Sequence, residues 1–306
     1  MSSKFKGNII LLITSLIWGI SFVSQSVGVK TLSPAAFNGI RTILGALVLV
    51  PVIFATDFVK KKNNTYHSEK KNKYLWLGGL VCGTALCAAS TVQTYGLVYT
   101  TAGKGGFITA LYILFVPIIG IFLGKRPGIN VLIGILLSLA GMYFLCLFGT
   151  DLTMNKGDAI IIVCAILFAV HIICVDYFSP RADGTKLACL QFFVSGTINI
   201  IMMLMSDTPT IQDVLSCAVP ILYSGVMSCG VAYTLQIIGQ KYTEPTIASI
   251  LMSFESVFSV LAGWLILKDA LSPAEGFGCV LMFSAIIVAQ LPRKFYKFPV
   301  KNQTNV

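Results

Sequence analysis

The sequence predicts an all-α integral membrane protein with ten transmembrane helices, built from two inverted five-helix repeats. Three observations support the prediction of a membrane protein. Apolar residues make up 56% of the 306 residues and charged residues only 11%, which lies outside the usual range of soluble domains. Apolar runs long enough to cross ~30 Å of hydrocarbon recur along the whole chain. Lysine and arginine residues gather in alternate connectors between those runs.

The apolar runs define the ten predicted helices, because about twenty mostly apolar residues are needed for one span. In chain order they are Asn8–Val29, Pro34–Thr56, Tyr74–Tyr95, Gly103–Leu123, Gly128–Gly149, Gly157–Phe178, Leu187–Ser206, Asp213–Gln240, Thr246–Leu267 and Pro273–Leu291. The first run is also compatible with a cleaved signal peptide, since Lys4 and Lys6 precede it. Its removal would leave nine helices and invert the side on which every later connector lies.

The distribution of positive charge predicts the orientation of the chain in the membrane. If the N-terminus lies inside, 17 of the 22 lysine and arginine residues fall in inner connectors or termini. Lys30, Lys104, Lys156 and Lys268 then lie outside, and Arg41 lies within a helix. By the positive-inside rule, both termini face the cytoplasm. Topology thus explains the net charge of +10, and the expected partners are the lipid bilayer and a small-molecule substrate, with no nucleic acid.

No sequence pattern typical of an enzyme, a metal site or an ATP-driven pump is found. The nine cysteines form no C-x-x-C spacing, and His67 and His171 are the two histidines, so we expect no metal and no cofactor. No G-x-x-x-x-G-K-[ST] motif occurs, which argues against ATP hydrolysis by this chain. The chain is therefore not expected to be an enzyme, and whether it is a monomer or a homodimer is left open.

An internal repeat divides the chain into residues 1–150 and residues 151–306. At a constant shift of 143 positions, identical pairs include Gln93/Gln236, Gly96/Gly239, Tyr99/Tyr242, Thr100/Thr243, Gly120/Gly263 and Lys125/Lys268. At a shift of 150, Trp18 aligns with Phe168. Each half holds five predicted spans, and an odd number makes the second half enter the membrane from the opposite face. Inverted repeats are typical of secondary transporters, whose substrate site lies near the midplane between the repeats.

Four short segments resemble the EamA type of the drug/metabolite transporter superfamily. They are Leu16–Phe22, Phe37–Arg41, Thr101–Phe107 and Leu251–Val257. The resemblance covers essentially the whole chain and implies a ten-helix carrier that exports or exchanges small metabolites, including amino acids, across a bacterial inner membrane. The chain departs from the family after the fourth and ninth helices, where Gly124–Pro127 and Leu267–Asp269 replace the usual glutamate.

Polar and aromatic groups at membrane depth are the candidate substrate or proton pathway, namely Glu255, Arg41, Lys104, Trp18, Tyr112 and His171. An ionisable side chain in hydrocarbon is costly and usually faces a cavity or a partner. Glu255 lies about 14 Å into its span, close to the midplane, and Tyr112 occupies the repeat-equivalent position. Each candidate has a structural alternative: Glu255 joins two helices, Arg41 and Lys104 extend to the outer interface, and His171 is a core residue. Trp18 and Tyr112 are packing residues or face lipid in this alternative.

These patterns together predict a secondary transporter that moves a small organic metabolite outward across the bacterial cytoplasmic membrane by alternating access. An amino acid or a related amine or carboxylate suits the charges, because Arg41 and Lys104 lie toward the outer side and Glu255 lies deeper. One alternative is a facilitator or exchanger of another metabolite, such as a nucleoside or sugar, whose exchange rate would not depend on a pH gradient. The other alternative is a membrane-embedded receptor.

Overall fold

We describe the fold from a computed structural model, over residues 3–63, 72–100, 102–125, 127–149, 155–206, 208–262 and 272–291. Every regular element in these ranges is helical. The elements are α1 (Ser3–Gly28), α2 (Pro34–Lys62), α3 (Lys73–Leu97), α4 (Ala102–Ala110), α5 (Tyr112–Phe122), α6 (Ile129–Cys146), α7 (Lys156–Phe178), α8 (Gly184–Ser206), α9 (Ile211–Ser216), α10 (Ala218–Leu222), the π-helix η1 (Tyr223–Tyr233), α11 (Thr234–Gln240), α12 (Pro245–Met252), α13 (Glu255–Ala262) and α14 (Pro273–Gln290). The predicted all-helical class is confirmed.

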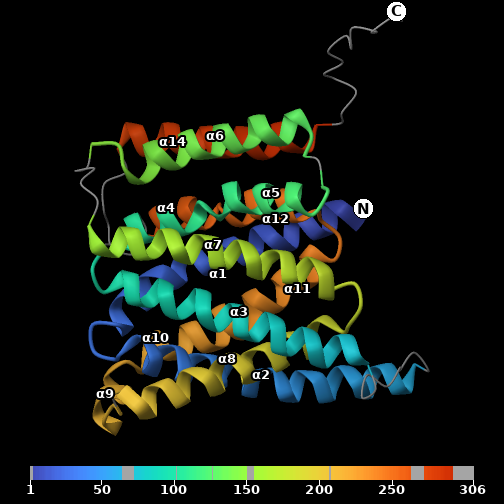
Figure 1. Ribbon diagram of the computed structural model, residues 1–306, viewed down its shortest axis with the longest axis vertical. Coiled ribbons are helices and arrows are strands. Elements are labelled where there is room, and N and C mark those ends of the chain that lie inside the picture. The colour runs from blue at the N-terminus through green and yellow to red at the C-terminus, as the bar shows by residue number, and fades with distance from the viewer. Residues whose placement is uncertain are drawn as a thin grey trace, which may run out of the picture.

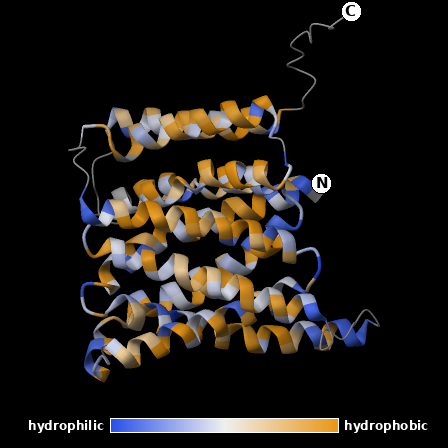
Figure 2. Ribbon diagram, viewed as in Figure 1, coloured by the Kyte–Doolittle hydropathy of each residue, from blue (hydrophilic) through white to orange (hydrophobic). Residues whose placement is uncertain are grey.

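The length and hydropathy of these helices are those of a multi-pass membrane protein. In the part of the chain that the structure describes, nine helical segments are long and apolar enough to cross a membrane, and Ile129–Leu145 is a shorter apolar helix. The helices lie side by side, with α6 and α14 packed together along one side (Figure 1). Hydrophobic residues extend along the helices, and hydrophilic residues gather toward the helix ends (Figure 2).

The start of α1 and the end of α14 lie at the same end of the bundle, which we call the N-terminal end (Figure 1). That this end faces the cytoplasm stays a prediction from the loop charges. The outside of the bundle carries large apolar side chains: Phe54, Phe122 and Met205 are 71%, 86% and 83% exposed. Soluble proteins rarely expose large contiguous apolar patches, so this surface is suited to lipid.

Glycines let helices from the two halves of the chain approach closely. A Cβ added to Gly157, at the start of α7, would lie 2.6 Å from the backbone oxygen of Gly96 in α3. In the same way, a Cβ added to Gly7 in α1 would lie 3.0 Å from the backbone oxygen of Gly239 in α11. Small residues allow such backbone contact between membrane helices. Each contact joins one half of the chain to the other.

Gly157→Ala is expected to destabilise the protein by about 1–3 kcal/mol, because the added methyl group has no room against α3. The midpoint of thermal unfolding of the purified protein in detergent measures this. Gly276→Ala is the matched control, since Gly276 also lies near the start of a helix and a Cβ there meets nothing within 4 Å. An unchanged midpoint for Gly157→Ala would contradict the close packing of α3 against α7.

Two ion pairs join α2 to the start of α8 at the N-terminal end. Lys60 Nζ lies 2.6 Å from Asp183 Oδ2, and Lys186 Nζ lies 2.8 Å from Asp57 Oδ2. Burial alone would raise the pKa of Asp183, but hydrogen bonds from the Lys60 side chain and the Lys186 backbone N–H outweigh this effect and hold the pKa below its usual value. The two pairs fix these ends of α2 and α8 to each other.

Three of the predicted spans are interrupted. Gly103–Leu123 is divided into α4 and α5, Thr246–Leu267 into α12 and α13 with its last residues outside the described chain, and Asp213–Gln240 into α9, α10, η1 and α11. The first two breaks are tight turns, in which Leu111 N–H donates to Ile108 O at 3.2 Å and Phe254 N–H donates to Leu251 O at 3.4 Å. A tight turn within an apolar run leaves the hydropathy unchanged, so the sequence predicted continuous helices.

Candidate functional site

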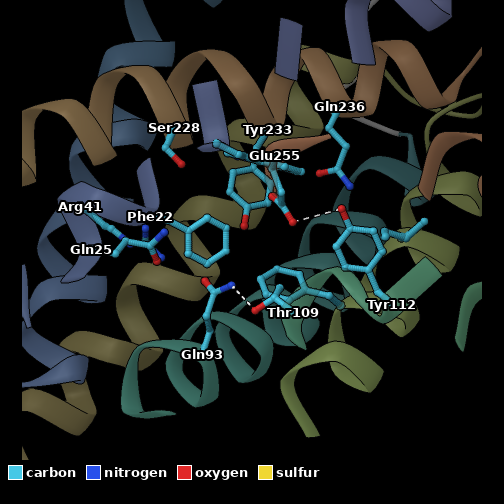
Figure 3. Close-up of a pocket in the computed structure, with 13 residues that line it drawn as sticks. Phe22, Gln25, Arg41, Gln93, Thr109, Tyr112, Ser228, Tyr233, Gln236 and Glu255 are labelled. Carbon is cyan, nitrogen blue, oxygen red and sulfur yellow. Dashed lines mark hydrogen bonds between the residues drawn. The ribbon is translucent and has the colours of Figure 1, made fainter. Parts of the chain in front are cut away.

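A cavity lies between α1, α2, α3, α4, α5, α7, η1, α11 and α13. Its aromatic and aliphatic wall consists of Trp18, Phe22, Tyr112, Phe168, Ile172 and Tyr233. Its other lining residues are Gln25, Arg41, Gln93, Thr109, Ser228, Gln236 and Glu255 (Figure 3). The space open to the centres of water molecules is ≈ 30 Å³, enough for about two waters. A ligand larger than two waters would therefore require the cavity to widen.

The two tight turns place a functional group at the start of each following half-helix. Tyr112 is the first residue of α5, and Glu255 is the first residue of α13. The Tyr112 hydroxyl donates a hydrogen bond to Glu255 Oε1 at 3.2 Å, and Glu255 is only 4% exposed. Gly19 lets α1 lie directly against this point, because a Cβ there would be 2.7 Å from the Glu255 backbone oxygen. The carboxylate is thus held between three helices.

Arg41 is positioned by a buried amide. Its Nε donates to Asn38 Oδ1 at 2.8 Å, and the guanidinium lies 5.4 Å from the centre of the Phe37 ring. Asn38 is itself tied to α3, because its Nδ2 donates to Ser90 O at 3.1 Å and to Thr94 Oγ1 at 2.8 Å. Since Asn38 is fully buried, its side chain cannot turn freely, and it fixes the direction in which Arg41 reaches the cavity.

Arg41, a basic residue, and Glu255, an acidic residue, line one cavity without forming an ion pair with each other. Within the described ranges, the ion pairs are those of Lys60, Lys125 and Lys186 with aspartates. Arg41 is 2% exposed, and a buried charge without a countercharge is costly. The two side chains therefore offer separate positions for a negative and a positive group of a ligand.

Other polar atoms of the cavity also lack partners. Trp18 Nε1, Gln25 Oε1 and Gln236 Oε1 form no hydrogen bond to any part of the chain that the structure describes. By contrast, Gln93 Nε2 donates to Thr109 Oγ1 at 3.2 Å. Buried polar groups are normally hydrogen-bonded, so these three atoms are available to water or to a ligand.

Eight of the thirteen lining residues form pairs that are related by the two sequence shifts. Four pairs separated by 143 or 150 positions line the cavity together: Trp18/Phe168, Phe22/Ile172, Gln93/Gln236 and Tyr112/Glu255. These separations are the two shifts found in the sequence. Both halves of the chain therefore contribute to one site.

The structure brings together four of the six candidate residues. Glu255, Arg41, Trp18 and Tyr112 line the cavity. His171 does not line it: the residue is fully buried, its Nε2 lies 3.2 Å from Gln191 Oε1, and its ring centre lies 6.1 Å from that of Tyr233. The side chain of Lys104 lies outside the described part of the structure. A transport role for any of the six stays a prediction.

Sequence reasoning gave no role to several polar lining residues, namely Gln25, Thr109, Ser228 and Gln236. These residues are uncharged, so they lower the hydropathy of an apolar run less than an ionisable residue does. They are therefore harder to recognise in the sequence. The repeat contained a usable signal for Gln236, because this residue is identical to Gln93 at the same shift that pairs Tyr112 with Glu255. Gln25 and Ser228 have no such signal.

A larger hollow of about 1120 Å³ opens at the N-terminal end. Charged and polar residues around it include Lys4, Asn8, Lys125, Asp176, Lys241 and Glu244. Lys125 Nζ and Asp176 Oδ2 form an ion pair of 2.6 Å between the end of α5 and the end of α7. No lining residue is shared with the central cavity, so the two spaces are separate in this structure.

Comparison with known proteins gives similarities over at least 90% of the chain. The sequence profile of the EamA-like transporter family matches residues 5–147 and again residues 155–290. An uncharacterized transporter of Archaeoglobus fulgidus is 29% identical over 287 residues, which cover 92% of this chain and 84% of the relative. The uncharacterized transporter YoaV of Bacillus subtilis is 20% identical over 279 residues, 90% of this chain and 93% of its own.

One solved crystal structure has the same fold. It superposes on this chain with a TM-score of 0.78 and covers 96% of this chain and 99% of its own, at 17% sequence identity. At that identity the similarity concerns the fold alone.

Proposed function

The chain belongs to the EamA-like transporter family, and from this premise we propose that it is a secondary carrier for a small zwitterionic metabolite such as an amino acid. The carrier moves this substrate outward across the bacterial cytoplasmic membrane by alternating access. The uncharacterized transporters to which the chain is similar support transport as such, and the substrate class rests on the cavity. We do not assign the chain an enzymatic activity.

The observation that supports the substrate class is that a basic and an acidic side chain line the central cavity at separate positions. Arg41 reaches it from α2 and Glu255 from α13. In Figure 3 the ring of Phe22 lies between the two side chains. A ligand with a carboxylate at Arg41 and an ammonium group at Glu255 would form a charge-assisted hydrogen bond at each end. A zwitterion provides both groups in one small molecule.

The arrangement of the lining supports alternating access between two inverted repeats, residues 1–150 and residues 151–306. The cavity is lined by repeat-equivalent pairs, and the family profile matches each half separately. Tyr112 and Glu255 each follow a break in a spanning segment, and interrupted helices at the midplane are typical of carrier sites. In this proposal the larger hollow at the N-terminal end is the inner entrance.

The topology prediction is that residue 64, in the connector between α2 and α3 and outside the described ranges, faces the cytoplasm. In a cysteine-free variant, Asn64→Cys is expected to resist a membrane-impermeant thiol reagent added to intact cells, whereas Lys30→Cys, in the exposed turn after α1, reacts. Labelling of residue 64 but not of residue 30 would contradict the predicted orientation.

Counterflow tests the transport proposal. Liposomes that contain the purified protein are loaded with an unlabelled pool of α-amino acids, and uptake of the same labelled pool is measured with and without a pH gradient. Uptake above that of empty liposomes, faster with the gradient, is the expected result. A rate that does not depend on the gradient would favour a facilitator or exchanger, and no uptake of any α-amino acid would contradict the substrate class.

A further inference from the structure

Gln236 of α11 has an acceptor atom in the central cavity that no contact within the described chain explains. The residue is 1% exposed and lines the cavity, and its Oε1 has no hydrogen-bond partner among the described residues. A buried carbonyl oxygen left without a donor costs free energy. Such an oxygen is therefore a position where the protein accepts a hydrogen bond from water or from a ligand.

The repeat-equivalent residue in the first half is in a different situation. Gln93 lines the same cavity, but its amide is engaged by Thr109, to which its Nε2 donates at 3.2 Å. The residue 143 positions after Thr109 is Met252, whose side chain offers no hydroxyl. The second half thus has no hydroxyl at the position equivalent to Thr109, and Gln236 Oε1 has no hydrogen-bond partner among the described residues.

A second asymmetry lies at the same wall. Position 112 is a tyrosine, whereas its equivalent, position 255, is a glutamate. In Figure 3 the amide of Gln236 lies beside the Tyr112 hydroxyl, which donates its hydrogen bond to Glu255, and the amide oxygen is on the side of Glu255. The two differences between the halves therefore leave three oxygen acceptors on one side of the cavity. They are the Glu255 carboxylate, Gln236 Oε1 and the remaining lone pair of the Tyr112 hydroxyl.

We infer that Gln236 is the third acceptor of a site for a primary ammonium group, formed with Glu255 and Tyr112, and that the carrier thereby selects primary amines over N-methylated ones. This inference rests on the proposed function. A primary ammonium group has three N–H donors, one for each of the three oxygens. An N,N-dimethyl ammonium group has one, so it would leave two buried acceptors without a donor. Sites built to hydrogen-bond a group discriminate strongly against ligands that lack it.

Counterflow with two labelled pools tests this assignment on the full-length protein in liposomes. The first pool contains α-amino acids with uncharged side chains, and the second contains their N,N-dimethyl derivatives. Wild-type protein is expected to take up the first pool at least about tenfold faster than the second, since a hydrogen bond to a charged group is at stake. Gln236→Leu is expected to reduce the uptake of the first pool and to lower the ratio of the two rates, because it removes one of the two acceptors that a dimethyl ammonium group would leave without a donor.

Two further variants distinguish recognition from a structural role. Gln93→Leu is the matched control in the other half, and it is expected to leave the ratio at its wild-type value. Gln236→Glu keeps an acceptor oxygen and is expected to keep the preference for the first pool.

If gel filtration shows that Gln236→Leu is poorly folded, Gln236→Met replaces it. A wild-type ratio in Gln236→Leu or Gln236→Met, or an equal loss of preference in Gln93→Leu, would overturn the assignment. Absence of uptake of both pools by wild-type protein would instead contradict the proposed function, and this assignment with it.

Discussion

Glu255→Gln is expected to abolish pH-driven uptake and to lower counterflow of α-amino acids about a hundredfold, because it removes a buried charge that pairs with the ligand. Glutamine has nearly the same size and still accepts the hydrogen bond from Tyr112, so insertion into the membrane is expected to be normal. It can neither bind a proton at this position nor balance the charge of an ammonium group. Uptake into liposomes with an imposed pH gradient measures the effect.

Glu275→Gln is the matched control for this experiment. Glu275 lies in the first turn of α14, where its carboxylate accepts from the Ser272 backbone N–H at 2.7 Å. Glutamine performs the same capping role, so transport in this variant should equal that of the wild type. If Glu255→Gln retained normal pH-driven flux, the role of Glu255 in transport would be wrong.

Arg41→Gln is expected to weaken binding of α-amino acids about tenfold or more, since a charge-assisted contact with the carboxylate is lost. Binding of the matching α-hydroxy amides, which are similar in size and carry no charge, should change much less. Competition of both compounds against labelled counterflow gives the two affinities. Arg181→Gln, at an exposed position after α7, is the control. Equal losses of affinity for the charged and the neutral ligands in Arg41→Gln would mean that Arg41 stabilises the fold and does not contact the carboxylate of the ligand.

Asn38→Ala separates the two possible roles of Arg41. It keeps the charge but removes the acceptor that holds the guanidinium Nε. We expect an intermediate loss of α-amino acid binding, smaller than that of Arg41→Gln and again larger than the loss for the neutral amides. A loss as small as that of Arg181→Gln would show that Asn38 does not position Arg41.

The spans could be predicted because hydropathy depends on residues that are neighbours in sequence. Glu255, Arg41, Trp18 and Tyr112 could be selected for a related reason, since a charge or a large polar ring in an apolar run is visible without knowledge of the fold. The repeat added one long-range relation, because it made Tyr112 and Glu255 equivalent. It did not predict that the two side chains form a hydrogen bond.

Features that depend on packing could not be predicted. The π-helix η1 places Ser228 on the cavity. Glycines within η1 pack closely on α2: a Cβ on Gly225 would lie 3.0 Å from the backbone oxygen of Arg41. The sequence of η1 does not indicate such a contact. In the same way, the sequence does not indicate that Gln236 Oε1 is left without a hydrogen-bond partner among the described residues, because this depends on how the helices pack.

The central claim, that one ligand binds Arg41 and Glu255 at the same time, is tested most directly by counterflow of three labelled pools with wild-type protein. The first pool contains α-amino acids, the second their methyl esters, which keep only the ammonium group, and the third the matching α-hydroxy acids, which keep only the carboxylate. The predicted result is rapid uptake of the first pool and uptake at least about tenfold slower for each of the others, because each leaves one buried charge without a partner. Equal uptake of either singly charged pool would contradict the claim.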